Sequence, residues 1–536
     1  MFARDNGEMF KATEVNPRVV GPDILDLDLN SGSGVQVRFR LAWLDRTAVV
    51  GRCEAENAVP AIVTDVSALH PDNASGTGPA ILTSGEISET RKGSICISLD
   101  NDSEDVSFVI GCWGELRDIW KRAVSSDFDG IFRRGLQFYD DLPMPENADD
   151  GLLRTYFKAC ATMKVNVESP CGEIETRWTT PDRWPHRHMW LWDSGFNSLG
   201  ARYLDIDLGK DAIRAVLFKQ RSDGFIPHTM APDPKHDSDM TQPPILAWAT
   251  MKLYSSGPDP DFLKDVYPGL RSYLEWDLGN MDRIGTGLLQ WEYDGADSGM
   301  DNSPRFDEGP DFDAVDLNCY AFNECLSLAN IATELGRGEE ALSWRRRAAA
   351  ISAKVNHDLW DDEDGFYYDR RKDGSWVKVK TSAGFAPLFS GIADSRRAAI
   401  LIGDHLTNPE EFWAPFPVPS VALNEDRFEL DMWRGPTWIN YNYLIVEGLK
   451  KLGYVELSLD LATRTIKEMD RWRSLRSSLY EFYDPFGQKP PQELPRKGKV
   501  REWPEDGIPV ISDFFWSSAL FVDMLMTIHG DSSDSL

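Results

Sequence analysis

The chain has 536 residues, a hydrophobic fraction of 42% and a formal net charge of −30. This length exceeds that of one ordinary hydrophobic core, so we expect two or more domains. The acidic excess repels nucleic acid and anionic membrane surfaces, which excludes both as partners and leaves a small neutral ligand.

The cysteines indicate the redox environment of the chain. There are seven of them, and no two form a CxxC pair. This usage is typical of reduced, mostly buried thiols in a cytoplasm. The N-terminus starts no apolar signal-peptide segment, and no apolar run reaches the roughly 18 residues that a membrane span needs. We therefore expect a cytoplasmic protein with no membrane-spanning segment. The sequence does not indicate its oligomeric state.

Residues 1–140 read as an N-terminal antiparallel β-sandwich domain. Turn-forming residues separate short apolar runs, of which one alternates apolar and polar residues. The expected strands lie at Val35–Arg40, Ala48–Val50, Ala61–Val63, Ser94–Leu99 and Val106–Ile110. A connecting helix is expected over Glu115–Tyr139, followed by a linker at 141–150.

Residues 151–530 have helical periodicity, and 531–536 read as a flexible tail. The pattern predicts roughly a dozen helices joined as hairpins. The clearest are Leu152–Val165, Asp211–Phe218, Ile245–Tyr254, Phe262–Leu278, Leu317–Leu335 with a second helix after it to Leu359, Arg396–His405, Tyr443–Leu449, Val455–Ala462 and Phe514–Ile528. Periodicity alone establishes helical hairpins. Because no repeat of fixed length is visible, an open solenoid is disfavoured, and we infer a mainly α fold with an (α/α)6-barrel catalytic domain.

Two acidic runs suggest the chemistry. The run from Asp297 to Arg305 holds two carboxylates, Asp297 and Asp301, among turn-forming residues that can aim a side chain from a rigid scaffold. Far downstream, Glu481 lies in an aromatic run. Two separated carboxylates in aromatic surroundings suggest glycoside hydrolysis, in which one acts as general acid and the other handles water.

Plainer interpretations exist for these acids. Asp301 can be a loop residue that bonds its own backbone. Glu481 follows a charged stretch and can be a surface carboxylate. Asp193 follows two tryptophans and can cap a helix that starts at Ser194, which is compatible with sugar binding. The agreement of several motifs favours the catalytic interpretation.

No metal and no organic cofactor is expected. Asp361–Gly365 is acidic, but it lacks the terminal bidentate Glu of an EF-hand loop and reads as a tight hairpin turn. His186, His188 and His228 read as hydrogen-bonding loop residues, since no HExxH motif is present.

Four ordered segments resemble glycoside hydrolase family 63, which is related to the trehalases of family 37. The segments are Trp190–Ser194, Asp297–Pro304, Arg434–Asn440 and Glu481–Pro485, and the resemblance covers roughly residues 150–528. It implies an (α/α)6 barrel and an inverting, exo-acting α-glycosidase.

By position, the resemblance makes Asp301 the general acid and Glu481 the general base. Asp297 is then a neighbour whose charge favours the protonated acid if both face one pocket, and Arg434 can either favour ionised Glu481 or pair with Asp431. The implied substrate-binding residues are Trp190, Trp192, Asp193, Gln242, Asp297, Asn302, Trp433, Arg434, Gly435 and Trp438.

We expect hydrolysis of an α-glucoside, either a disaccharide or a small glucoconjugate. Met432 stands where several relatives that act on glycosylglycerates carry an aromatic residue, and minimal members lack a β-domain; both departures argue against a glycerate aglycone. The alternatives are a mannosyl- or glucosylglycerate hydrolase and a trehalase-like enzyme. Outside hydrolysis, a phosphorylase on the same toroid and a saccharide-binding protein stay open.

Overall fold

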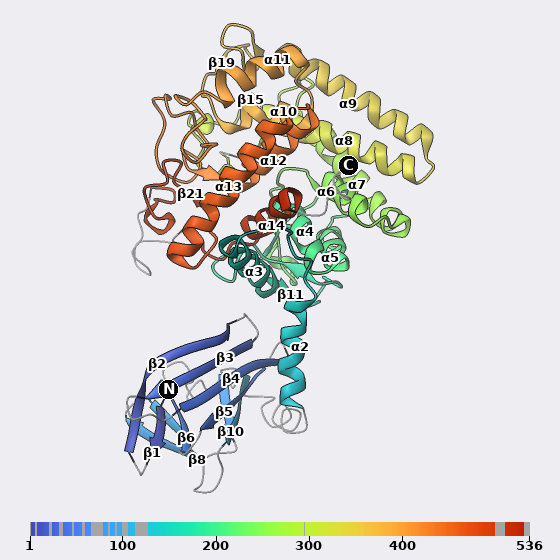
Figure 1. Cartoon of the computed structure of the whole chain (residues 1–536). Helices are drawn as coiled ribbons and strands as arrows, with labels where there is room; N and C mark the ends of the chain where they lie inside the picture. Colours follow the sequence, from blue (N-terminus) through green and yellow to red (C-terminus); the bar gives the residue numbers. More distant parts are fainter. Residues whose placement is uncertain are drawn as a thin grey trace. The chain divides into compact units, whose positions relative to one another are not determined.

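The computed structural model describes residues 127–293, 295–498 and 510–529, and before them the strands given below. The chain divides into two compact units, Met1–Leu142 and Pro143–Leu536. Figure 1 shows that strands dominate the first unit and helices the second.

The described strands of the first unit pair antiparallel in the order β7-β10-β5-β4-β3-β2-β1-β6-β9-β8. Strand β6 also contacts β5 and β10, with which it does not pair. The strands are β1 Phe2–Asp5, β2 Glu8–Val20, β3 Ile24–Ser31, β4 Gln36–Asp45, β5 Ala48–Ala55, β6 Val59–Asp65, β7 Pro79–Thr83, β8 Glu86–Arg91, β9 Ser94–Ser98 and β10 Asp105–Cys112.

The five expected strands overlap β4, β5, β6, β9 and β10, except that Val35 and Leu99 lie outside the described residues. Helix α2, Phe128–Asp140, contacts β3 and β4, and its Asp129 Oδ1 lies 2.6 Å from Arg40 Nη1. The first part of the expected connecting helix, residues 115–126, lies outside the described residues, as does the tail 531–536.

The second unit is mainly helical. Its longer helices are α3 Asp150–Val165, α4 Leu191–Leu204, α5 Ile206–Phe218, α6 Leu246–Ser256, α7 Pro260–Asn280, α8 Val315–Glu334, α9 Gly338–Asp358, α12 Ile439–Lys451, α13 Val455–Arg476 and α14 Phe515–His529. The shorter ones are η3 Pro234–His236, η4 Pro304–Phe306, η5 Ser382–Phe385, α10 Ala386–Ser390, α11 Ser395–Ile400, η6 Leu401–Leu406 and η7 Pro491–Glu493. Aspartates 149, 205 and 259 cap α3, α5 and α7 with their side chains.

Short antiparallel sheets of two strands, and one of three in the order β15-β18-β19, occur in the loops between these helices. Their strands are β11 Val167–Glu168, β12 Trp178–Thr179, β13 Met189–Trp190, β14 Thr229–Met230, β15 Phe312–Asp313, β16 Trp360–Asp361, β17 Phe366–Tyr367, β18 Asp369–Arg371, β19 Trp376–Val377, β20 Thr437–Trp438 and β21 Phe482–Tyr483. Strands β16 and β17 flank the hairpin turn expected at Asp361–Gly365.

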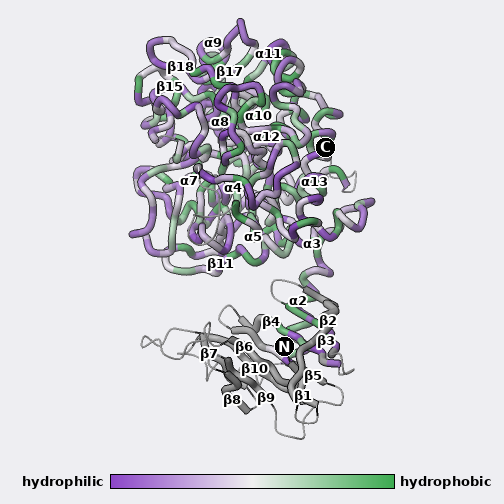
Figure 2. Tube along the Cα trace, turned by 90° about the vertical axis from the view of Figure 1, so that its left-hand side faces the viewer, coloured by the Kyte–Doolittle hydropathy of each residue, from purple (hydrophilic) through white to green (hydrophobic). Residues whose placement is uncertain are grey.

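Six helices contact one another in a closed cycle. In chain order, α4, α6, α8, α10, α12 and α14 each contact the next, and α14 contacts α4. Outer helices pack on this cycle, with α5 on α4, α9 on α8 and α13 on α12. Figure 2 shows hydrophilic residues (purple) along the outer parts of the helical unit and apolar residues (green) toward its interior.

Two helices differ from the expectation. Helix α4 begins at Leu191, and every residue from Leu191 to Ala201 is buried, so it lacks the polar face that reveals an amphipathic helix. Helix α13 continues to Arg476 through the stretch that read as charged surface.

Four cysteine side chains are described, and all four are free thiols. Cys160, Cys319 and Cys325 are free and buried, and Cys171 is free and exposed. Among the described helices, none combines the length and the apolar character needed to cross a membrane.

Candidate active site

A cavity in the helical unit is lined by Asp301 and Glu481, the two carboxylates singled out in the sequence. Its wall is drawn from segments spread over most of the unit. The lining residues are Pro181, His186, Trp190, Trp192, Asp193, Gln242, Gly299, Asp301, Met432, Trp433, Trp438, Glu481, Arg496, Phe514 and Trp516.

Asp193 reaches the cavity from the first turn of α4. Strand β13 pairs with β14 and leads directly into this helix, which begins at Leu191 with no side-chain cap. The suggested cap at Asp193 is therefore not formed. Burial raises the pKa of Asp193 well above its usual value, and the carboxylates of Asp182 and Glu481 raise it further. Such a carboxyl suits hydrogen bonds to sugar hydroxyls.

Tryptophans form the apolar part of the wall. The rings of Trp433 and Trp438 stack with their centroids 3.8 Å apart, and Trp516 meets Trp192 edge to face at 5.2 Å. Gln242 Oε1 accepts a hydrogen bond of 3.4 Å from the backbone N–H of Trp192. Flat apolar faces beside polar groups are suited to sugar rings.

Asp301 lies on a tight loop that packs against the ring of Trp192. Gly299 has a φ of 73°, and a Cβ at this position would come within 2.4 Å of the Trp192 ring. Only glycine fits both this backbone conformation and this approach. The glycine in the motif therefore places Asp301 against the tryptophan wall.

Asp297 does not line the cavity. Its Oδ2 accepts hydrogen bonds from the backbone N–H groups of Glu292 at 2.6 Å and Tyr293 at 3.2 Å. Burial raises the pKa of Asp297 to about 6. The expectation that it faces the same pocket as Asp301 is not met, because its carboxylate closes a turn.

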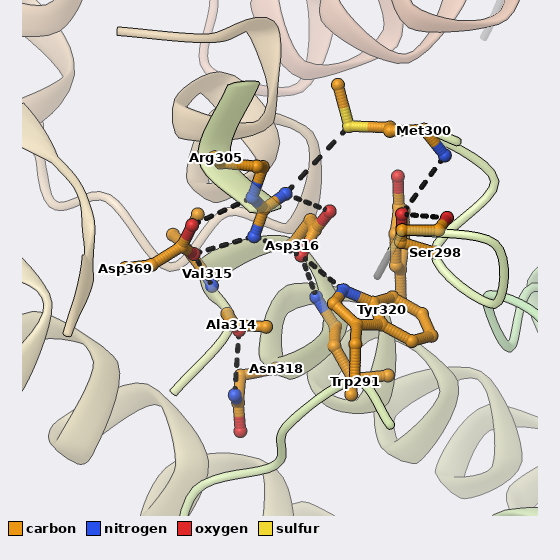
Figure 3. Close-up of polar contacts among 12 residues, drawn as sticks. Trp291, Ser298, Met300, Arg305, Ala314, Val315, Asp316, Asn318, Tyr320 and Asp369 are labelled. Carbon is orange, nitrogen blue, oxygen red and sulfur yellow. Dashed lines mark hydrogen bonds and ion pairs between the residues drawn. The ribbon is translucent and has the colours of Figure 1, made fainter. Parts of the chain in front are cut away.

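A buried ion-pair network around Arg305 joins the loop that follows Met300 to neighbouring elements (Figure 3). Arg305 donates to Asp316 Oδ2 at 2.5 Å and to Asp369 Oδ1 at 2.6 Å, and all three side chains are buried. Its Nη1 lies 3.8 Å from Met300 Sδ, whose residue directly precedes Asp301. The network thus ties the loop to α8 and β18.

Three residues that were expected to line the cavity do not line it and instead contact the segments that form its wall. Asn302 Oδ1 accepts a hydrogen bond of 2.8 Å from the Trp433 backbone, and Arg434 pairs with Asp307 at 2.7 Å. Gly435 packs against backbone, since a Cβ there would come within 2.3 Å of a carbonyl oxygen. Asn302, Arg434 and Gly435 therefore position the wall and do not line the cavity, and the side chain of Arg434 meets neither Glu481 nor Asp431.

Arg496 makes the contact with Glu481 that Arg434 does not make. Glu481 directly precedes β21, which pairs with β20, and it is buried. Arg496 Nε lies 3.3 Å from Glu481 Oε2, and Arg496 Nη2 lies 3.3 Å from His186 Nε2. His186 Nδ1 in turn lies 2.6 Å from Asp182 Oδ2. Burial acts to lower the pKa of Arg496, but the charges of Glu481 and Asp301 outweigh it and raise that pKa.

Asp301 also has a cationic partner. Lys497 Nζ lies 2.6 Å from Asp301 Oδ2. Arg496 and Lys497 are adjacent in sequence, so one short segment pairs with both candidate catalytic carboxylates.

Several residues that line the cavity carry no signal in the sequence. Arg496, Phe514 and Trp516 lie in no recognised motif, and His186 was treated as a plain loop residue. The one local signal was the spacing of Asp182 and His186, which lie four residues apart and whose Oδ2 and Nδ1 atoms are within hydrogen-bond distance. The described residues contain no group of three or more side chains suited to hold a metal ion.

The helical unit is similar to known proteins. Residues 186–517 match the family model described as the mannosylglycerate hydrolase MGH1-like glycoside hydrolase domain. A mannosylglycerate hydrolase of Thermus thermophilus is 27% identical over 393 residues, which span 58% of this chain and 91% of the relative.

Solved structures extend the comparison to the fold. The GH63 mannosylglycerate hydrolase from a second strain of Thermus thermophilus, in complex with glucose, is 26% identical, with a TM-score of 0.56 over 68% of this chain and 99% of that chain. Neutral trehalase from Saccharomyces cerevisiae, at 17% identity, shares the fold with a TM-score of 0.53 over 70% of this chain and 80% of its own. The resemblance to glycoside hydrolase family 63 is confirmed.

Proposed function

The chain belongs to the mannosylglycerate hydrolase MGH1-like glycoside hydrolase family, and from this premise we propose that it is an inverting, exo-acting α-glycosidase. Asp301 is the general acid and Glu481 the general base. The observation that carries the proposal is that these two residues, far apart in sequence, line one cavity together with Asp193 and a tryptophan wall.

The reaction consumes one water and breaks one glycosidic bond. Glu481 takes a proton from a water that attacks the anomeric carbon, while Asp301 gives its proton to the departing aglycone oxygen. Inversion requires roughly 6.5–9.5 Å between the two carboxyl groups, with the water between one of them and the sugar. Arg496 Nε lies 3.3 Å from Glu481 Oε2 and so holds this carboxylate in place within the cavity.

The residues of the cavity suit a single terminal sugar. Asp193 and Gln242 offer hydrogen-bond acceptors for its hydroxyls, and Trp192 offers an apolar face for the ring. One sugar bound among these groups leaves the aglycone on the side of Asp301, because the acid must reach the leaving oxygen.

The named relatives favour mannosylglycerate as the first candidate substrate, since several are called mannosylglycerate hydrolases. Small α-glucosides are the second candidate, on the motifs alone. A phosphorylase is separated from both by product analysis in phosphate-free buffer. A saccharide-binding protein would bind the sugar without forming product.

We further propose that the helical unit is an (α/α)6 barrel and the first unit a β-sandwich. The closed cycle of α4, α6, α8, α10, α12 and α14 supports the barrel. Contacts of β6 with β5 and β10, outside its own pairings, support a sheet folded over itself.

The test is a screen of mannosylglycerate and small α-glucosides, with proton NMR of the first-formed anomer. Asp301→Asn and Glu481→Gln are each expected to lower kcat by about 10²–10⁴-fold while the far-UV circular dichroism stays unchanged. Asp311→Asn, at an exposed position, is the control. Wild-type rates in either variant would contradict the roles, and a first-formed α-anomer would contradict inversion.

A further inference from the structure

Two consecutive cations hold both candidate catalytic carboxylates. Arg496 contacts Glu481 and His186, and its side chain is 12% exposed. Lys497 contacts Asp301 at 2.6 Å with its side chain 51% exposed. Arg496 is thus wedged into the wall, whereas the Lys497 ammonium is free to move toward a ligand on the solvent side.

The backbone around Lys497 is held in an unusual conformation. Lys497 has a φ of 58°, in the left-handed region that a residue with a side chain rarely adopts. The next backbone N–H, that of Gly498, donates to Asp431 Oδ2 at 2.6 Å. The backbone carbonyl of Asp431 accepts from Asn302, the neighbour of Asp301. The segment is therefore anchored beside the acid, and strain of this kind is found at functional positions.

The Lys497–Asp301 pair opposes general-acid catalysis. The acid must deliver a proton to the leaving oxygen when the bond breaks. The ammonium also occupies Oδ2, one of the two oxygens that can donate to the leaving group. Turnover requires Lys497 to leave Asp301, which costs free energy unless the ammonium gains another anionic partner.

The overall charge makes such a partner hard to attract without a local cation. The chain carries a net charge of −30, and the cavity lining includes the carboxylates of Asp301 and Glu481 beside the guanidinium of Arg496. An anionic ligand is repelled by both. Lys497 is the exposed cation beside Asp301 in the described part of the site, so it can offset that repulsion on the aglycone side.

We propose that Lys497 is a specificity-determining residue that recognises a carboxylate on the aglycone by exchanging partners. In the empty site it pairs with Asp301. When a carboxylate-bearing aglycone binds, the ammonium moves to that carboxylate and Asp301 takes up a proton from solvent, ready to donate it to the leaving oxygen. This inference rests on the proposed function of Asp301.

The test compares mannosylglycerate with mannosylglycerol, which carries a hydroxymethyl group in place of the carboxylate. The wild type is expected to prefer mannosylglycerate in kcat/KM by about tenfold or more, the size of one charge-assisted hydrogen bond. Lys497→Met lowers the value for mannosylglycerate and raises it for mannosylglycerol, so the preference falls at least tenfold. Lys497→Arg restores the preference in part.

Lys378→Met is the matched control, because Lys378 pairs with Asp361 outside the cavity at 43% exposure. It is expected to leave the preference unchanged. A general structural effect would change kcat/KM for both substrates by the same factor. An unchanged preference for mannosylglycerate in Lys497→Met therefore overturns the proposal. A wild type with equal rates on both substrates overturns it as well.

Binding measurements distinguish a wrong inference about Lys497 from a wrong assignment of the proposed function. If the wild type cleaves neither substrate, calorimetry with D-glycerate and with glycerol still reports on Lys497. Glycerate that binds the wild type at least fivefold more tightly than Lys497→Met, with no such difference for glycerol, supports carboxylate recognition. Equal glycerate affinities refute it.

Discussion

Replacing Arg305 with Met tests the network behind the Asp301 loop. The guanidinium is 1% exposed and bridges Asp316 and Asp369 with four hydrogen bonds of 2.5–3.0 Å. Removing one partner of a buried ion pair costs about 3–5 kcal/mol. Here two buried carboxylates lose the same cation. Each keeps a backbone N–H donor, from Leu317 at 2.8 Å or Val315 at 2.9 Å. We therefore expect a loss of about 5 kcal/mol at pH 7, near the upper end of that range.

The pH dependence has a definite sign. Burial raises the pKa of Asp369 to about 6 even with Arg305 in place. A carboxyl whose pKa is higher in the folded than in the unfolded state adds stability at low pH and loses it as pH rises through the folded pKa. Without Arg305 this effect grows, so the deficit should be smaller at pH 5 than at pH 7.

Urea unfolding of the full chain, followed by tryptophan fluorescence at both pH values, measures this deficit. Arg464→Met is the control, since Arg464 makes an exposed pair with Asp460 at 3.0 Å, and it should cost less than about 1 kcal/mol. A deficit for Arg305→Met below about 1 kcal/mol, or one equal at pH 5 and pH 7, would refute the reasoning.

Two further perturbations separate local causes. Gly299→Ala should lower both stability and kcat more than Gly309→Ala does, because both glycines have positive φ but only the first would place a Cβ on Trp192, while nothing lies within 4 Å at the second. Equal effects in thermal unfolding and turnover would rule out the clash. Burial lowers the pKa of His228 to about 4, so its stability contribution is present above about 6.5 and lost as pH falls toward 4. His228→Gln should therefore flatten the stability curve between pH 6.5 and 4, and an unchanged slope in urea unfolding would argue against a neutral buried ring.

The sequence predicts helices well where one face meets solvent. The expected second helix, which ends at Leu359, matches α9, because its buried residues recur at three- to four-residue steps and the rest of the helix is more exposed. Helix α4 was indicated only by the suggested cap at Asp193, since its first eleven residues, Leu191–Ala201, are all buried and present no polar face. Its Gly, Ser and Asp residues also read as loop formers.

The sequence motifs singled out two carboxylates that line one cavity, but they predicted the other lining residues less well. Asp301 and Glu481 were found because each lies in a motif whose residue types suit the reaction. Arg434 was expected in the cavity because it shares a motif with Trp438, but a motif does not reveal which way a side chain points. Arg496 was missed for the opposite reason, since its contact with Glu481 depends on tertiary structure that no local pattern encodes.

Helix α14 joins the last part of the described chain to the first helices of the unit. It packs against α3, α4, α12 and α13, and its Phe515 N–H donates to the Pro181 carbonyl at 2.7 Å. A ribosome-bound chain that still lacks α14 must therefore leave the apolar sides of α4 and α12 uncovered. Such an intermediate exposes apolar surface, to which chaperones bind during synthesis. A nascent chain of this kind should have no hydrolytic activity until α14 has emerged.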